Sequence, residues 1–166
     1  PAPYVDADTG VVVHSVYRKS ERALASLLTA LDVEVVLVDI QDVGTRLYTF
    51  VWTLYSLMKA ACALRSPPRF LIADRPNPIG GRVVEGPVLN ASCCASRYGY
   101  LPIPHRHGLT IGEAARLFAH SLGSAAPQVT VEPLRNWRRS LMFDELGLPW
   151  LPPSPNLPTA ASALAY

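Results

Sequence analysis

Residues 33–40, with the sequence VEVVLVDI, constrain the fold of this chain more than any other segment. The run is almost continuously apolar and rich in β-branched side chains. Such runs are typical of strands in parallel sheets, which are buried on both faces. Parallel strands are joined by right-handed crossovers, and these place helices on both faces of the sheet. We therefore expect a buried parallel strand here.

The rest of the chain supplies the alternation of strands and helices that such a sheet needs. Further strands are expected at 11–16, 70–73 and 129–132, and helices at 20–31, 45–64 and 110–122. The last helix opens with Thr110-Ile111-Gly112-Glu113, a capping box in which Glu113 is the N3 partner of Thr110. Residues 75–108 are expected to be irregular and residues 149–158 extended. This order predicts an α/β domain with a mostly parallel sheet.

Composition narrows the class of protein. The 166 residues suit one domain, and 49% hydrophobic with 17% charged residues excludes intrinsic disorder. A net charge of +2 argues against nucleic acid or an anionic membrane as partner, and no apolar run reaches the roughly 18 residues of a membrane span. The three cysteines, Cys62, Cys93 and Cys94, have no zinc-binding spacing and do not fix a redox compartment. The chain begins at Pro1 rather than Met, so the absence of a recognisable signal peptide carries little weight.

Two acidic segments follow expected strands, residues 39–44 and residues 74–78. Ligands of parallel α/β sheets bind at the carboxyl ends of strands, so neighbouring strands would bring both segments to one crevice. For Asp42, helix capping and catalysis are equally good interpretations, whereas Asp74 is better explained as a turn residue. Gly44 would let the backbone approach a ligand closely.

Two further groups of residues can carry chemistry. Glu85 lies between Gly and Pro residues, which can position and partly desolvate a general acid, although a solvated surface Glu is the simpler interpretation. His105-Arg106-His107 is the only histidine cluster, and without a third ligand motif no metal site is expected. Substrate contact and structural packing both remain open for this cluster.

Taken together, these motifs resemble the exo-β-N-acetylmuramidase (NamZ) family, long known only as a domain of unknown function. The segments that carry the resemblance are DIQDVGTR at 39–46, YTF at 48–50, DRPNP at 74–78, EGP at 85–87, PIPHRHGLTIGE at 102–113, WLPPSPNLP at 150–158 and AY at 165–166. They occur in the family's order from about residue 8 to the end of the chain. Several multi-residue matches in one order are far more specific than any single motif.

The resemblance implies a glycoside hydrolase that releases N-acetylmuramic acid from the non-reducing ends of peptidoglycan fragments, without a cofactor. It implies that residues 1–166 form part of a Rossmann-like N-terminal catalytic domain. The family's opening strand with its Glu-His-Gly loop and its C-terminal domain are not found in the chain. An extracellular or periplasmic location is favoured. A non-catalytic sugar- or peptidoglycan-binding remnant and a generic α/β phosphate-binding domain remain the alternatives.

The resemblance also gives the candidate residues their roles. Glycoside cleavage usually needs two carboxyl groups, and we expect Glu85 as the general acid and Asp42 as the second or supporting carboxylate. The substrate contacts expected from the motifs are Arg46, Asp74, Arg75, Asn77, His105 and Arg106, with Arg106 preferred to His107. The arginines can bind the lactyl carboxylate of muramic acid. Retaining, inverting and substrate-assisted mechanisms all stay open.

Overall fold

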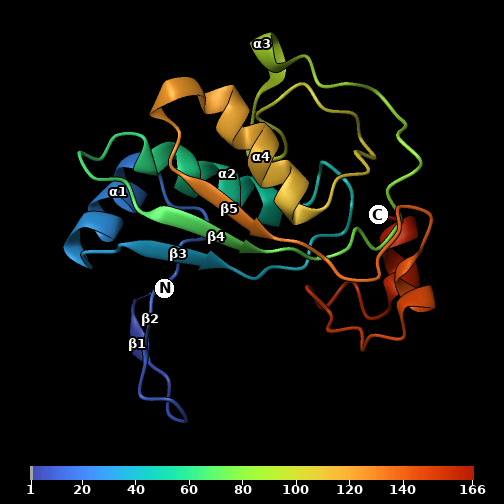
Figure 1. The fold of residues 1–166 in the computed structure, drawn as a ribbon, viewed down its shortest axis with the longest axis horizontal. Helices are drawn as coiled ribbons and strands as arrows, with labels where there is room; N and C mark the ends of the chain where they lie inside the picture. Colours follow the sequence, from blue (N-terminus) through green and yellow to red (C-terminus); the bar gives the residue numbers. More distant parts are fainter. Residues whose placement is uncertain (1) are drawn as a thin grey trace.

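The computed structural model describes residues 2–166, and a parallel three-stranded sheet lies at its centre. The strands run in the order β3 (Val35–Val38), β4 (Arg69–Ala73) and β5 (Val129–Glu132), each parallel to its neighbour. Helices α1 (Glu21–Ala30), α2 (Phe50–Ala61) and α4 (Ile111–Leu122) pack together on this sheet (Figure 1). The α/β class with a parallel sheet is confirmed, as are the strands expected within 33–40, at 70–73 and at 129–132.

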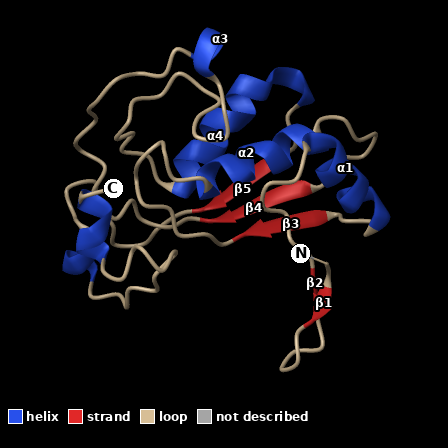
Figure 2. Cartoon of the chain, turned by 180° about the vertical axis from the view of Figure 1, so that it is seen from behind, coloured by secondary structure: helices blue, strands red, loops and turns tan. Residues whose placement is uncertain are grey.

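The helices cover one face of the sheet rather than both (Figure 2). Phe70 and Ile72 point into the core beneath the helices and are 1% and 0% exposed. On the opposite face Leu37 is 65% exposed and Leu71 is 38% exposed. The expectation of helices on both faces is therefore wrong for residues 2–166, which supply helices to one face only. An apolar strand indicates that both faces can be covered, but it does not say which segment covers them.

The N-terminal segment departs from the expected topology. Residues 11–16 do not join the parallel sheet: β2 (Val12–Val13) pairs antiparallel with β1 (Tyr4–Val5) in a hairpin that projects away from the sheet (Figure 1). The reason is local. Asp6 Oδ2 accepts hydrogen bonds from the Thr9 amide at 3.0 Å and the Thr9 hydroxyl at 2.6 Å, and Gly10 takes a φ of +70°. This turn closes a hairpin before the strand can reach the sheet.

Two of the three main helices begin with a side-chain cap. Ser20 caps α1 by accepting from the Ala23 amide at 3.3 Å. The capping box of α4 is confirmed, because Thr110 Oγ1 accepts from the Glu113 amide and Glu113 Oε2 accepts from the Thr110 amide. The second helix, however, begins at Phe50 and not at 45. Thr45 instead forms an isolated antiparallel bridge with Arg106, and the Arg46 amide donates to the His105 carbonyl at 2.7 Å.

The two irregular segments surround the carboxyl edge of the sheet. Between 75 and 108 the chain forms only one helical turn, α3 (Ala91–Cys94). Later come the short 3₁₀ turns Gly123–Ala125, Phe143–Leu146 and Ala160–Leu164. The expected extended segment at 149–158 contains no helix or strand, and its Leu157 packs against Val43 and Ile79 in a small second core. Within residues 2–166, no helix combines the length and apolarity needed to cross a bilayer.

Candidate active site

The two acidic segments meet at the carboxyl edge of the sheet, as the sequence predicts. Because β3 and β4 are parallel neighbours, the residues that follow them leave the same edge. Arg75 Nε donates to Asp39 Oδ1 at 2.5 Å, and Gln41 Nε2 donates to the Pro76 carbonyl at 3.1 Å. The hydrogen bond from Arg75 is the main reason that the pKa of Asp39 lies below its usual value.

A crevice of about 280 Å³ opens beside this ion pair. Its polar side is formed by the acidic segment and Arg75. Its apolar side comes from distant parts of the chain, namely Phe50 at the start of α2, Phe143 and the proline-rich segment 149–153. An apolar wall with a few polar groups is the usual make-up of a small-molecule site. We call this the edge crevice.

Behind the edge crevice, Asp42 is buried against His107. The two side chains are 7% and 2% exposed, and His107 Nε2 lies 3.5 Å from Asp42 Oδ2. The same oxygen accepts from the Gly44 amide at 2.9 Å. Asp42 therefore organises its own loop and does not cap α2, whose N-cap residue is Thr49. Of the two interpretations of Asp42, helix capping is therefore wrong.

Three polar atoms around this pair are buried without a hydrogen-bond partner among residues 2–166. They are Asp42 Oδ1, Thr45 Oγ1 and His107 Nε2. The other ring nitrogen, His107 Nδ1, accepts from the Leu109 amide at 3.1 Å, so a neutral imidazole carries its proton on Nε2 and directs it at Asp42. Unsatisfied buried polar groups are rare in folded proteins, and a cluster of them points to a functional site.

Glu85 lies on the other side of the segment 105–107. Its Oε1 accepts from Arg106 NH1 at 2.9 Å, and the two residues also exchange main-chain hydrogen bonds at 3.2 and 3.0 Å. The Glu85 side chain is 61% exposed, whereas Arg106 is 17% exposed and also donates to the Ile79 carbonyl. Arg106 thus holds the carboxylate of Glu85 in an exposed position, next to the groove that Arg106 lines, although Glu85 is not itself among the lining residues of a cavity at this edge.

An open groove of about 500 Å³ runs beside Arg106. Its walls are residues 79–83 on one side and 139–142 on the other, and they include the arginines Arg82 and Arg139. Arg139 donates to the carbonyls of Gly81 at 3.2 Å and Gly108 at 3.0 Å. No motif marked Arg139 in the sequence, because its contacts join segments far apart in the chain. We call this the arginine groove.

Three of the residues that were expected to contact substrate form hydrogen bonds that hold the loops of the site together. Asp74 accepts from the Gly112 amide at 2.7 Å and the Thr110 hydroxyl at 3.0 Å, so it stabilises the start of α4. Asn77, which is 2% exposed, joins its own turn to the Leu109 carbonyl at 3.0 Å. Arg46 is 8% exposed and donates to the carbonyls of Pro87 at 2.9 Å and Ile103 at 2.7 Å. These bonds give all three residues a structural role.

Of the remaining predicted residues, Arg75 lines the edge crevice and Arg106 the arginine groove. His105 is half-buried, and its main-chain carbonyl joins it to Arg46. The family motifs favour Arg106 over His107, and no local pattern in the sequence reveals that His107 pairs with Asp42. Within residues 2–166, no three His, Cys, Asp or Glu side chains cluster closely enough to hold a metal ion.

Comparison with known proteins identifies the family. Residues 2–161 match the profile of the family described as "Exo-beta-N-acetylmuramidase NamZ, N-terminal". The chain belongs to this family. It is 43% identical over 163 residues to the "Peptidoglycan beta-N-acetylmuramidase NamZ" of Bacillus subtilis (strain 168), an alignment that covers 98% of this chain and 38% of that protein. The resemblance read from the motifs is confirmed.

Solved structures agree with this assignment to the NamZ N-terminal family. Two DUF1343 family proteins from Bacteroides fragilis NCTC 9343 superpose with TM-scores of 0.84 and 0.76, at 34% and 38% sequence identity. The alignments cover 95% and 96% of this chain but only 40% and 42% of theirs. The chain thus spans about two fifths of the length of the relatives that it matches.

Proposed function

We propose that residues 1–166 form part of the catalytic domain of an exo-β-N-acetylmuramidase, which releases N-acetylmuramic acid from the non-reducing end of peptidoglycan fragments. Family membership and the name of the Bacillus subtilis relative support the reaction. The observation that carries the site is the arrangement of two carboxylates around the segment 105–107. Buried Asp42 contacts His107, and exposed Glu85 contacts Arg106.

The two carboxylates lie in different environments, Asp42 buried and Glu85 exposed. One carboxyl group must protonate the leaving oxygen, and the other must stabilise or attack the sugar as positive charge develops on it. Glu85 is accessible to a substrate because its side chain is 61% exposed, so it is the proposed acid. Asp42 is the proposed second or supporting carboxylate. Its Oδ2 accepts from the Gly44 amide and faces His107 Nε2 at 3.5 Å, whereas Oδ1 has no partner among residues 2–166 and is available for a reacting or orienting contact.

Arginine side chains at the site can bind the anionic group of the sugar. Muramic acid carries a lactyl carboxylate that glucosamine lacks, and guanidinium groups bind carboxylates through paired hydrogen bonds. Arg75 in the edge crevice and Arg106 in the arginine groove are the proposed contacts, together with His105. In this proposal Arg46, Asp74 and Asn77 position the loops through the bonds described above.

The test uses the chain extended to the length of its relatives. Glu85→Gln keeps the size of the side chain but cannot donate the carboxyl proton, so release of N-acetylmuramic acid from a chromogenic muramide should fall by roughly 10²–10⁴-fold. Glu132→Gln is the matched control, because Glu132 is also an exposed acid at the carboxyl end of a strand. Near-normal turnover by Glu85→Gln would place the acid elsewhere. Muramide binding without turnover in the unaltered protein would favour the non-catalytic binding alternative.

A further inference from the structure

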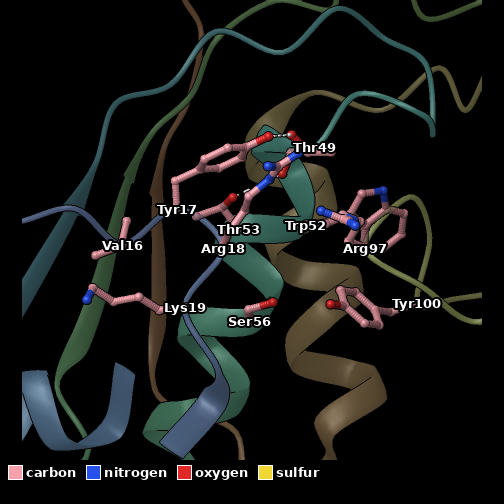
Figure 3. Close-up of a pocket in the computed structure, with 10 residues that line it drawn as sticks. All are labelled: Val16, Tyr17, Arg18, Lys19, Thr49, Trp52, Thr53, Ser56, Arg97 and Tyr100. Atoms are coloured by element: carbon pink, nitrogen blue, oxygen red, sulfur yellow. Dashed lines mark hydrogen bonds between the residues drawn. The ribbon is translucent and has the colours of Figure 1, made fainter. Parts of the chain in front are cut away.

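A third cavity, separate from the edge crevice and the arginine groove, lies against the first turns of α2 (Figure 3). Its volume is about 230 Å³. Three parts of the chain form it: residues 16–19 before α1, one side of α2 from Thr49 to Ser56, and the loop residues Arg97 and Tyr100. It shares no lining residue with the other two sites.

The cavity has a concentrated positive charge. Arg18, Lys19 and Arg97 line it, and no Asp or Glu does. None of the three forms a salt bridge within residues 2–166. The guanidinium groups of Arg18 and Arg97 lie on the same side of the cavity, whereas the Lys19 ammonium points away from them (Figure 3). Two cations without a counter-charge repel each other, and an anion placed between them removes that repulsion. Three arginines at the other two sites, Arg75, Arg106 and Arg139, have a carboxylate partner instead.

Hydroxyl groups complete the lining. Thr49, Thr53 and Ser56 follow one another along one side of α2, at the spacing that aligns side chains on a helix. Thr49 is the N-cap residue, yet its hydroxyl does not cap the helix and instead donates to Tyr17 Oη at 3.3 Å. The first amides of α2 therefore lack a side-chain cap at the end of the helix that favours anions.

The backbone at Arg18 is strained. Its φ is +60°, in the left-handed region that glycine occupies easily and arginine does not. The guanidinium lies 5.3 Å from the centre of the Tyr17 ring, at the wall of the cavity (Figure 3). Strained residues cluster at ligand-binding sites, where the surrounding structure maintains an unfavourable conformation for the sake of function.

We propose that this cavity binds a compact oxyanion, a carboxylate or a phosphate, carried by a small organic molecule. The guanidinium groups of Arg18 and Arg97 and the hydroxyl of Ser56 would hold the anion, since the hydroxyls of Thr49 and Thr53 already donate to Tyr17 and to the Thr49 carbonyl. The rings of Tyr17 and Tyr100 would contact the organic part. This site is additional to the proposed muramidase site and does not depend on it, because the two share no residue.

The test titrates the isotope-labelled chain with inorganic phosphate by two-dimensional NMR, at constant ionic strength set with chloride. We expect saturable shifts confined to residues 16–19, the start of α2 and residues 97–100. Arg18→Gly should weaken binding at least tenfold without lowering Tm, because glycine relieves the strained backbone. Arg97→Ala should weaken it similarly. Arg65→Ala, an exposed arginine outside the cavity, is the matched control and should stay within twofold.

Titration with two further ligands distinguishes a phosphate from a carboxylate as the anion that the cavity binds. Saturation by glucose 6-phosphate but not by N-acetylmuramic acid would identify a phosphate ligand, and the reverse would identify a carboxylate; either result supports the anion site. Shifts spread over all surface arginines, or affinities that are equal in Arg18→Gly, Arg97→Ala and Arg65→Ala, would overturn it. The outcome is independent of the Glu85→Gln assay, which reports on the muramidase site alone.

Discussion

His107 directs its Nε2 at Oδ2 of Asp42 across 3.5 Å, in a region where both side chains are almost fully buried. The two residues come from segments far apart in the chain. The contact joins the loop after β3 to the segment before α4, and the amides of Gly44 and Leu109 hold the two side chains from either side. The pair therefore supports the loops around it and, in the proposed mechanism, orients the second carboxylate.

Asp42→Asn tests this double role. The amide keeps the shape of the side chain but loses the charge that faces His107 and Gly44. A hydrogen bond to a charged group contributes about 1.5–3 kcal/mol, so we expect a loss of unfolding free energy within that range, together with reduced muramide turnover. Urea unfolding and turnover are measured on the same variant. Asp144→Asn, at an exposed acid, is the control; an equal change in both variants would contradict the role of the buried pair.

Selectivity for muramic acid tests the arginine contacts. Arg75→Gln and Arg106→Gln each remove a guanidinium that lines one of the two cavities at this edge. A charge-assisted hydrogen bond contributes about 1.5–3 kcal/mol, so each variant should bind N-acetylmuramic acid at least tenfold more weakly. Affinity for N-acetylglucosamine should hardly change. Calorimetry with both sugars makes the comparison, and Arg116→Gln on the exposed side of α4 is the control. Equal affinity of the unaltered protein for the two sugars would refute anionic recognition.

The parts of the fold that were predicted correctly depend on local patterns. A few neighbouring residues are enough to recognise three of these features: the apolar run that contains β3, the strand at 70–73 and the capping box of α4. Because β3 and β4 are parallel neighbours, the two acidic segments that follow them lie at one edge of the sheet. Residues 11–16 show the limit of this reasoning. The same apolar pattern suits a hairpin, and the turn at Asp6 decides between the hairpin and the sheet.

The site was harder to predict because its contacts are tertiary. Nothing near Arg46 in the sequence shows that its guanidinium is buried and bonded to two main-chain carbonyls. The pairing of His107 with Asp42 likewise depends on main-chain contacts between residues 44–46 and residues 105–107. Family motifs can identify such residues as a group. They do not distinguish a residue that positions a loop from one that contacts substrate.

Gly44 illustrates a positioning role that stability measurements can test. Its φ is +86°, and a Cβ there would lie 2.2 Å from Asn77 Oδ1 and 2.7 Å from Ile79. Gly44→Ala therefore adds a steric clash to backbone strain, and we expect a loss of about 2–4 kcal/mol of unfolding free energy. Gly10→Ala is the matched control, because its φ is +70° but a Cβ there meets nothing within 4 Å. That variant should lose only about 1 kcal/mol. Similar losses for both variants would mean that Asn77 moves aside freely. In that case the site would not need a glycine at position 44.

Tyr48 predicts how stability depends on alkaline pH. Burial, assisted by the negative charge of nearby Asp42, raises the pKa of Tyr48 to about 12 from its ordinary value of 10.0. The hydroxyl remains protonated in the folded protein and donates to the Pro153 carbonyl at 3.0 Å, which ties the proline-rich segment to the start of α2. In the unfolded chain the same hydroxyl ionises near pH 10. Between pH 10 and about 12 the folded state therefore holds more protons than the unfolded state, so stability must fall as pH rises through this window.

Tyr48→Phe removes this contribution to the pH dependence. We expect the variant to be less stable than the unaltered protein at pH 8, because it loses the bond to Pro153, and the difference to shrink as pH rises from 10 toward 12. Unfolding free energies measured by urea at several pH values give this difference directly. Tyr98→Phe, at a tyrosine that is 45% exposed, should parallel the unaltered protein over the same range. A Tyr48→Phe difference that stays constant from pH 8 to 12 would mean that Tyr48 ionises at the same pH in the folded and unfolded chains, and that the proline-rich segment does not shield it from water.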